Sequence, residues 1–359
     1  MKLFRIVLAV TFTAAAATLT TPVAAGPFLD PLNVPAAVSP LAEKSLLQGV
    51  TRAGDRLVAV GQRGHILVSL DNGATWKQAK VPVSSDLTAV FFIRDRKGWA
   101  VGHDGVVLGT TDGGDTWTLQ LDGPRANDLL VAHLQHRAAE APNSSEIKQL
   151  LEDAKRFKDQ GADKPFLDVW FADDNNGYVV GAYNLIFRTT DGGKNWQPWF
   201  DRTDNPKQFN LYAIRPAAGG LFIAGEGGLV LKLDAEGQRF RALDVPYKGS
   251  FFGLIGSHDS VLVFGLRANA FRSDDGGKSW TKVDVGLPAT IVAGTQAGVG
   301  TIVLVDAGGR IVASTDGGRS FVKIPLPATV PVTGIAEVGN GRYALVGPRG
   351  VAVVERPRS

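Results

Sequence analysis

The sequence contains no cysteine, and its one methionine is the first residue. A chain without cysteine forms no disulfide, offers no thiol nucleophile and cannot hold a cysteine-ligated metal centre. Long apolar stretches are also missing, because after residue 25 no segment approaches the roughly 18 continuous apolar residues of a membrane-spanning helix. We therefore expect a mature chain without a membrane span, held together by burial and hydrogen bonding alone.

The first 25 residues have the parts of a secretory signal peptide. Lys2 and Arg5 give a basic start, residues 6–19 are apolar or small, and Ala24 and Ala25 fit the cleavage position. We predict cleavage after Ala25 and a periplasmic location. Removing the two basic residues lowers the formal net charge from +3 to +1, so charge gives no reason to expect a nucleic-acid partner.

Glycine, by contrast, is frequent at 43 residues, and much of it falls in a repeat. A strand-like apolar run that ends in glycine recurs about every 40 residues, a spacing typical of propeller blades. One interval is nearly twice as long, which indicates an insert between the second and third copies. The runs are 57–61, 99–102, 178–181, 222–225, 262–265, 302–306 and 343–347, with Asp306 in place of the glycine in the sixth.

Most copies continue into a Ser/Thr-x-Asp-x-Gly-x-x-aromatic element, the Asp-box of BNR repeats. Its carboxylate can accept backbone N–H groups of the turn, and its aromatic ring can pack between neighbouring blades. Because the turn itself uses this chemistry, we interpret the boxes as structural. Their residues are Asp71, Asp112, Asp191, Asp275 and Asp316, with Trp76, Trp117, Trp196 and Trp280 at the aromatic position.

These repeats predict an all-β fold, a single seven-bladed β-propeller over residues 26–359. The seventh copy lacks an outer strand, so we predict that residues 26–40 close the last blade. The insert between blades two and three, residues 123–164, is expected to form a helical hairpin whose second helix is capped by Asn143. It would lie on the face of the turns that follow each repeated glycine, as a lid, a docking arm or a decoration of the rim.

Those turns and the loops between blades carry the residues that we expect to bind a partner. Arginine suits such a role because its guanidinium pairs with carboxylates through two hydrogen bonds and stacks on aromatic rings. Ordinary solvated turn residues are the alternative interpretation. The candidates are Arg63, Arg349, Arg267, Arg202, His103, Tyr183 and Glu226, of which Arg63 and Arg349 fall in adjacent blades once the ring closes.

The Gly-x-Arg-Gly turn at 61–64, and the turn and box within 181–196, resemble the photosystem II stability/assembly factor-like family of BNR propellers. The resemblance implies an exported, non-enzymatic scaffold that binds a membrane protein or a subunit of a membrane complex and is a monomer outside that complex. Similar proteins of non-photosynthetic bacteria look like periplasmic accessories of RND-type exporters. The helical insert departs from the plain pattern and favours this second group.

An enzyme is the alternative function. A sialidase-like glycoside hydrolase of the BNR type needs two carboxylates at one sugar-binding cleft, and a carbohydrate-binding propeller would use the same face. The available carboxylates fall in turns of different blades: Asp104, Asp201, Glu226 and Asp306. The five histidines are dispersed, so we expect neither a metal nor a cofactor. We therefore expect a binding protein, with glycosidase activity as the alternative.

Overall fold

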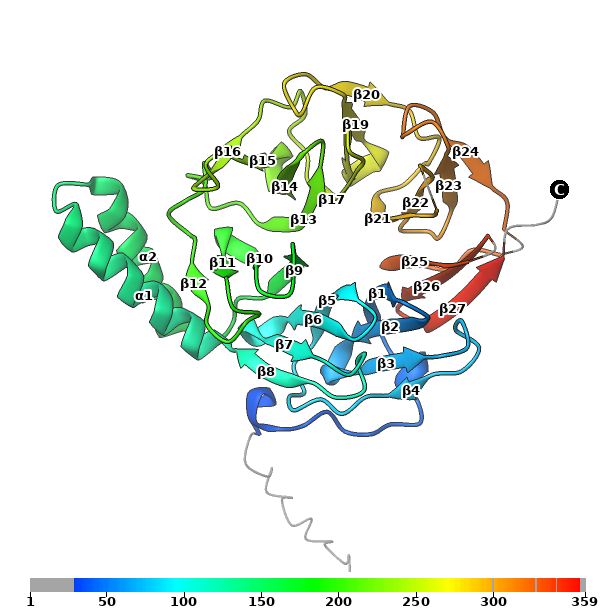
Figure 1. Cartoon of the computed structure of the whole chain (residues 1–359), viewed down its shortest axis with the longest axis horizontal. Coiled ribbons are helices and arrows are strands. Elements are labelled where there is room, and N and C mark those ends of the chain that lie inside the picture. Colours follow the sequence, from blue (N-terminus) through cyan, green and yellow to red (C-terminus); the bar gives the residue numbers. More distant parts are fainter. Residues whose placement is uncertain (1–28, 299, 327, 340, 356–359) are drawn as a thin grey trace, which may run out of the picture.

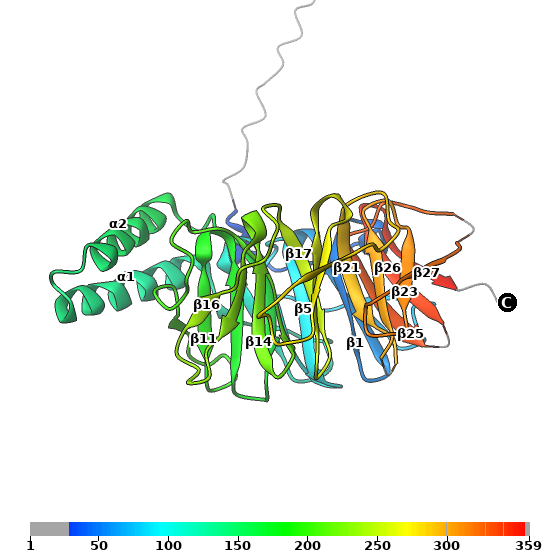
Figure 2. The same ribbon diagram turned by 90° about the horizontal axis from the view of Figure 1, so that it is seen from above.

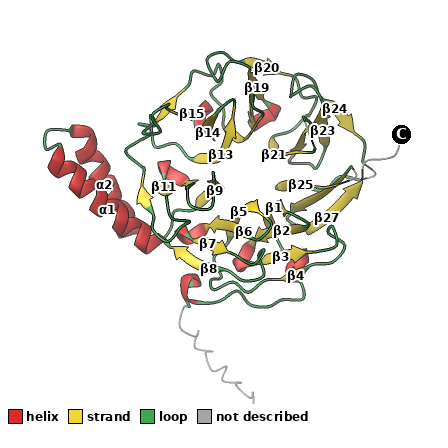
Figure 3. Ribbon diagram, viewed as in Figure 1, coloured by secondary structure: helices red, strands yellow, loops and turns green. Residues whose placement is uncertain are grey.

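The computed structural model describes residues 29–298, 300–326, 328–339 and 341–355, so the predicted signal peptide lies outside the described residues. The chain forms seven antiparallel sheets around a ring, the blades of a β-propeller (Figure 1). Seen from its side, the ring is a disc from which two helices project (Figure 2). Most of the helix lies in that hairpin, and the ring consists of strands and loops with a few short helical turns (Figure 3).

The strands of each blade follow one another in the chain from the centre of the ring outward. Blade one contains β1 (Leu47–Ala53), β2 (Arg56–Gly61), β3 (Ile66–Ser69) and β4 (Lys77–Gln78), and blade two contains β5 (Leu87–Arg94), β6 (Lys97–Gly102), β7 (Val107–Thr110) and β8 (Thr118–Leu121). Blade three contains β9 (Phe166–Phe171), β10 (Gly177–Gly181), β11 (Ile186–Thr189) and β12 (Gln197–Pro198), and blade four contains β13 (Leu211–Ala217), β14 (Gly220–Gly225), β15 (Val230–Leu233) and β16 (Phe240–Ala242). Blade five contains β17 (Phe251–Gly256), β18 (Val261–Gly265), β19 (Ala270–Ser273) and β20 (Thr281–Val283), and blade six contains β21 (Ile291–Gln296), β22 (Ile302–Asp306), β23 (Ile311–Ser314) and β24 (Val322–Ile324). In the part of the chain that the structure describes, blade seven has three strands, β25 (Gly334–Gly339), β26 (Arg342–Gly347) and β27 (Gly350–Glu355).

The glycine that ends the second strand of most blades is explained by a close approach between backbones. A Cβ atom on Gly61 would lie 2.2 Å from the carbonyl oxygen of Leu46, which precedes the inner strand of the same blade. At Gly102 the corresponding distance to the Asp86 carbonyl oxygen is 2.1 Å. Any side chain would force the two strands apart. Blade six instead has Asp306, whose buried carboxylate accepts N–H groups of its own turn.

The insert forms helices α1 (Gly123–Glu140) and α2 (Ser145–Gln160), which follow β8 and precede β9 in the chain. Ser144 caps α2 by accepting the N–H of Ile147 at 3.2 Å, one residue later than the expected cap at Asn143. The hairpin projects outward from the ring and does not cross its centre (Figure 1), so it is not a lid over the channel. Neither these helices nor any other helix of the described ranges is long and apolar enough to cross a membrane.

The prediction that residues 26–40 close the last blade is wrong for the part of this segment that the structure describes. Residues 29–40 contain no strand. They run along the outer edge of blade one, where Ala36 donates its N–H to the carbonyl of Val81 at 3.1 Å and Ser39 donates to the Gln78 side chain at 3.0 Å. The segment carries three prolines, and since proline lacks an N–H it cannot supply a regular strand ladder.

Candidate partner-binding face

The turns after the second strand of each blade lie on one face of the ring, which we call the tip face. The loops that lead into each inner strand share this face, because the strands of a blade alternate in direction, and the Asp-boxes lie on the opposite face. The turns are η3 (Gln62–Gly64), η4 (His103–Gly105), η5 (Ala182–Asn184), η6 (Glu226–Gly228) and η7 (Leu266–Ala268), with residues 307–310 and 348–349 in blades six and seven.

Five of these turns hold their middle residue in the left-handed backbone region. Glycine adopts this conformation freely, whereas any other residue costs about 1 kcal/mol or more. Four tips therefore carry a non-glycine residue although its left-handed backbone costs conformational free energy. Such strain is typical of functional positions. The φ angles are 55° at Arg63, 56° at Asp104, 54° at Tyr183, 65° at Gly227 and 56° at Arg267.

Three of these middle residues are fixed by a side chain of the following blade. In each pair the backbone N–H of the tip residue donates to a side-chain oxygen that stands just before the next inner strand. The tips are thus held by their neighbours as well as by their own blade, which makes the tip face a rigid surface. The pairs are Arg63 with Asp86 at 2.7 Å, Tyr183 with Asn210 at 2.9 Å and Arg267 with Thr290 at 3.3 Å.

The predicted arginines fall into two groups. Arg63, Arg267 and Arg349 are exposed on three separate turns, and within the described ranges no side chain pairs with their guanidinium groups. Arg202 is half-buried, and its guanidinium lies 4.3 Å from the centre of the Trp199 ring. We therefore interpret the first three as available to a partner and Arg202 as part of the packing between blades.

The helical hairpin reaches the tip face at Tyr183, whose side chain remains 54% exposed. Its ring centre lies 6.1 Å from that of Phe157 on α2, and the ammonium nitrogen of Lys164 lies 5.7 Å from the Tyr183 ring. A cavity of about 520 Å³ separates α2 from the loop after blade three, and Glu146 and Arg239 are among its lining residues. The hairpin, the tip of blade three and the loop after blade three therefore form one continuous surface.

A buried carboxylate anchors α1 to blade three. Asp201 has a side chain only 2% exposed, and its two oxygens meet the Nε2 of His133 and the Nε of Arg137, each at 2.9 Å. Burial acts to raise the pKa of Asp201, but the hydrogen bonds and charges of His133 and Arg137 outweigh it and hold this pKa below its ordinary value. This carboxylate is fully used in positioning the hairpin.

Two other carboxylates considered for a glycosidase are also engaged. Glu226 is half-buried and accepts a backbone N–H of the neighbouring loop at 3.2 Å. Asp306 is completely buried and accepts N–H groups of its own turn and the Nε of Arg310 at 2.8 Å. His103 is exposed beside Asp104 on η4. Across the part of the chain that the structure describes, no three His, Asp or Glu side chains are grouped as metal ligands.

The Asp-boxes use their polar groups within the turn. In blade two, Asp112 accepts the Thr110 hydroxyl at 2.8 Å, the Thr116 N–H at 3.0 Å and the Thr116 hydroxyl at 2.6 Å. The indole N–H of Trp117 donates to the Gly114 carbonyl at 3.0 Å, and its ring is 4% exposed between blades one and two. The same bonds from a Ser/Thr hydroxyl and from a backbone N–H recur at Asp71, Asp191, Asp275 and Asp316.

The central channel holds charged residues that our reading of the sequence missed. Arg52, Arg215 and Glu337 line a cavity of about 480 Å³ at the mouth opposite the tip face. Arg215 donates to the buried carboxylate of Asp168 at 2.5 Å. Burial raises the pKa of Asp168 above its ordinary value, although Arg215 and the N–H of Ile214 oppose the shift. The sequence signal that could have located this pair is a charged residue, Arg215 or Asp168, within an otherwise apolar inner strand.

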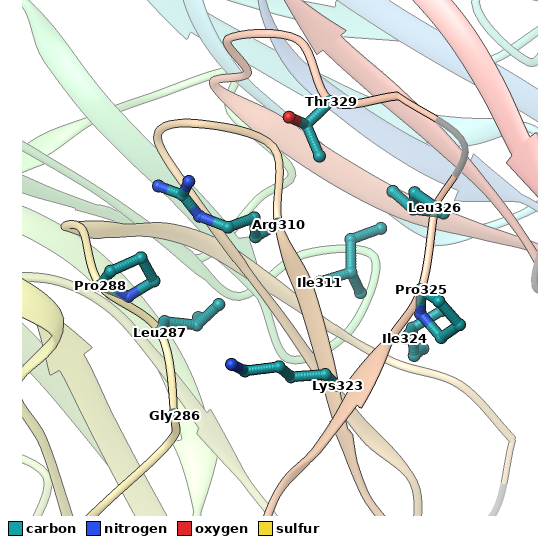
Figure 4. A pocket seen from close by; sticks show the side chains of 10 residues that line it. All are labelled: Gly286, Leu287, Pro288, Arg310, Ile311, Lys323, Ile324, Pro325, Leu326 and Thr329. Atoms are coloured by element: carbon teal, nitrogen blue, oxygen red, sulfur yellow. The ribbon is translucent and has the colours of Figure 1, made fainter.

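A second feature missed from the sequence is an apolar pocket on the outer side of blade six, of about 690 Å³ (Figure 4). Its lining includes Leu287, Ile311 and Ile324, with Arg310 and Lys323 beside them. The guanidinium of Arg310 is engaged with Asp306. The lining residues come from three segments that are separated in the sequence, so no local motif predicts the pocket.

Comparison with known proteins places these features in a family. A family model described as photosynthesis system II assembly factor YCF48 matches residues 38–111, 68–141 and 151–250, and a BNR/Asp-box repeat model matches residues 271–282. The photosystem II assembly lipoprotein Ycf48 of Synechococcus sp. (strain CC9902) is 29% identical over 118 residues, which cover 32% of this chain and 35% of the relative. The protein of the same name from Prochlorococcus marinus is 58% identical over 31 residues, 9% of each chain.

Solved structures share the fold. A structure described as YCF48 bound to D1 peptide has a TM-score of 0.61 and 14% identity, and covers 88% of this chain and 95% of its own. YCF48 from Cyanidioschyzon merolae has a TM-score of 0.61 and 17% identity over 89% and 97% of the two chains. A streptogramin B lyase scores 0.64 at 12% identity over 88% and 95%, so this fold also carries enzymes.

Proposed function

This chain belongs to the photosynthesis system II assembly factor YCF48 family of Asp-box propellers, and on that premise we propose that it is an exported, non-enzymatic accessory factor. It acts in the periplasm and binds a membrane protein or a subunit of a membrane complex through its tip face. The specific partner that we propose is a subunit of an RND-type exporter, and the helical hairpin, an addition to the plain propeller, extends the binding surface.

The observation that carries this proposal is the set of strained tips. Arg63 and Arg267 are exposed in left-handed backbone that glycine would adopt freely, yet both are arginines with no intramolecular partner for the guanidinium in the described ranges. A backbone cost without a packing gain supports a role in contacts with another molecule. Exposed arginine is also the residue best suited to carboxylates and aromatic rings of a partner.

Two further points support binding over catalysis. A propeller of this family is described in complex with a D1 peptide, so recognition of a segment of another protein is a function to which this fold is suited. The carboxylates of Asp201 and Asp306 are occupied by partners of their own, which removes them as free acids or bases for glycoside hydrolysis.

The test is copurification after crosslinking in native membranes. Replacing Arg63→Glu together with Arg349→Glu is expected to reduce capture of the membrane partner about tenfold or more, because charge reversal opposes carboxylate binding. Arg96→Glu, an exposed arginine on the opposite face, is the matched control and should leave capture unchanged. All variants should melt at the wild-type temperature. Undiminished capture by the tip variant overturns the arginine role.

A panel of glycosides tests the alternative. The proposed function predicts no turnover by the wild-type protein. Turnover that falls in Asp104→Asn or Glu226→Gln would identify a hydrolase and contradict the proposal.

A further inference from the structure

The outer edge of β27 is open among the residues that the structure describes. In the other six blades a fourth strand, β4, β8, β12, β16, β20 or β24, pairs with the third. In blade seven β27 is the outermost strand (Figure 1). An unpaired edge presents a row of free N–H and C=O groups that can pair with another chain.

The hydrogen-bonding register identifies which groups face outward. Val346 pairs with Val351 across the hairpin, and the Val346 carbonyl accepts the N–H of Thr333 on the side of β25. Since backbone groups alternate along a strand, the N–H and C=O of Val351 and Val353 point away from β26, toward the open edge. In blade one the residue aligned with Val351 is Ile66, because Val60 pairs with it in the same way.

The complete blades show what these groups normally bind. The carbonyls aligned with that of Val351 each accept a backbone N–H from the segment that leaves the Asp-box. The pairs are Ile66 with Ala79 at 2.8 Å, Ile186 with Trp199 at 2.9 Å and Val230 with Leu243 at 2.9 Å. Among the described residues, blade seven therefore offers the acceptor without the donor.

Side chains of the third strand are also less buried in blade seven than in the six complete blades. The first two residues of the third strand, or their register equivalents, are buried in each of the six complete blades, as Ile66 and Leu67 are in blade one. The equivalent residues of blade seven are Val351, which is half-buried, and Ala352, which is exposed. A fourth strand would remove this apolar surface from water.

Trp76, the box tryptophan of blade one, lacks a support that other box tryptophans have. Trp117 packs in one cluster with Ala79, and Trp196 packs in one cluster with Leu121, each from the outer segment of the preceding blade. Trp76 instead packs against a cluster that Val353 of blade seven also contacts, and it is half-buried, as Trp280 is. An apolar side chain of an added strand would lie over the open side of its ring.

Two segments near the start of the chain lie close to β27, and we take the space that they leave as better suited to one extended chain than to a second folded sheet. A Cβ atom on Gly350 would lie 1.9 Å from the carbonyl oxygen of Glu43, so the segment before β1 closes one end. A Cβ atom on Gly73 would lie 2.5 Å from the Val353 side chain, so the box of blade one closes the side. Residues 29–40, expected here from the sequence, lie along blade one instead.

We propose that the open edge of β27 is a docking site for an extended segment of a partner protein, which joins blade seven as an antiparallel fourth strand. Recognition by strand addition takes its affinity from main-chain bonds and its selectivity from the side chains that enter pockets. The segment carries an apolar residue at the position that covers Trp76, where the complete blades have Ala79, Leu121, Trp199, Leu243, Val283 and Ile324. This site is separate from the tip face and does not depend on the arginines there.

A synthetic peptide with the sequence of residues 319–326, which includes β24, is the probe. Added to the full chain at saturating concentration, it should slow hydrogen exchange of the Val353 amide about tenfold or more and shift the fluorescence of Trp76. A peptide with Ile324→Asp is the matched control and should do neither. A Trp76→Phe protein should keep the slowed exchange and lose the fluorescence change.

Because the decisive substitution is in the peptide, folding of the protein is not at issue. Unchanged Val353 exchange, or equal protection by the Ile324→Asp peptide, overturns the proposal. Protection of the Val353 amide in the free protein also overturns the proposal. Light scattering would show whether a second copy of the chain causes that protection, and removal of residues 1–28 would show whether the chain's own start causes it.

Discussion

The backbone N–H of Arg63 donates to the carboxylate of Asp86 at 2.7 Å, which joins the tip of blade one to the start of blade two. The bond holds Arg63 in a left-handed conformation and leaves its guanidinium free to face outward. The tip face is therefore built by pairs of blades, and the presentation of one arginine depends on a residue in the next blade.

Removing the acceptor should loosen this tip. Asp86→Ala is expected to lower the free energy of unfolding by about 1 kcal/mol, because a charge-assisted hydrogen bond is lost at a partly exposed site. Hydrogen exchange at the Arg63 amide should accelerate. Asp55→Ala, an exposed aspartate in the turn between β1 and β2, should change neither quantity. Equal effects from the two substitutions would contradict the pairing.

Glycine at the strained tip should stabilise the protein while weakening partner capture. Arg63→Gly relieves the left-handed conformation, and we expect a gain of about 0.5 kcal/mol in unfolding free energy. Gln62→Gly, one residue earlier in the same turn, should instead cost about 0.5 kcal/mol because it only adds freedom to the unfolded chain. Denaturant unfolding measures both. A loss of stability in Arg63→Gly would remove the argument from strain.

The Asp-boxes predict a loss of stability in acid. The Thr75 hydroxyl and N–H, with the Ser69 hydroxyl, lower the pKa of Asp71 to about 2, and similar bonds lower the pKa of Asp275 and Asp316. A carboxyl with a lower pKa in the folded state stabilises it above the ordinary value near 4 and loses that effect as pH falls toward 2. Melting temperature should therefore drop between pH 4 and 2, and Asp71→Asn should flatten the drop. An unchanged slope in that variant would show that the bonds to Asp71 do not couple to folding.

Replacing one partner of the ion pair in the channel should lower the free energy of unfolding more than replacing both partners. Arg215→Met leaves the buried Asp168 without its cation, and we expect a cost of about 2 kcal/mol, reduced by the partial exposure of Arg215. Arg215→Met combined with Asp168→Leu should cost less than Arg215→Met alone. A double-mutant cycle of unfolding free energies tests this, and strict additivity would refute the coupling.

Loss of the contacts to Asp201 should loosen the helical hairpin without destabilising the ring of blades. His133→Ala removes one of its two partners, so α1 should become more sensitive to proteolysis while the strands keep their exchange protection. His136→Ala, a 75% exposed neighbour on the same helix, is the control. Equal cleavage of the two variants would exclude an anchoring role for His133.

The sequence predicted the propeller because its signals are local and repeated. Each Asp-box closes on itself through residues no more than four apart, as Asp112 does with Thr110 and Thr116. Each repeated glycine marks one close contact between adjacent strands. Each tip turn comes directly after a repeated glycine, so the repeat located the tip residues in the sequence. It did not predict their left-handed backbone conformation.

What could not be predicted depends on contacts between distant segments. Residues 29–40 meet blade one through backbone bonds that have no sequence signature, and this left β27 without its expected partner. The direction of the hairpin is fixed by His133 and Asp201, 68 residues apart. Arg215 and Asp168 come from the inner strands of two neighbouring blades and meet only when those blades pack together.

The most direct test of the central claim is site-specific photocrosslinking in native membranes. A photoreactive residue at Tyr183, on the tip face, should give an adduct with a membrane protein. The same residue at Leu70, 69% exposed on the Asp-box face, should give none. An adduct from position 70 alone, or from neither position while the chain still copurifies with its partner, would contradict binding through the tip face.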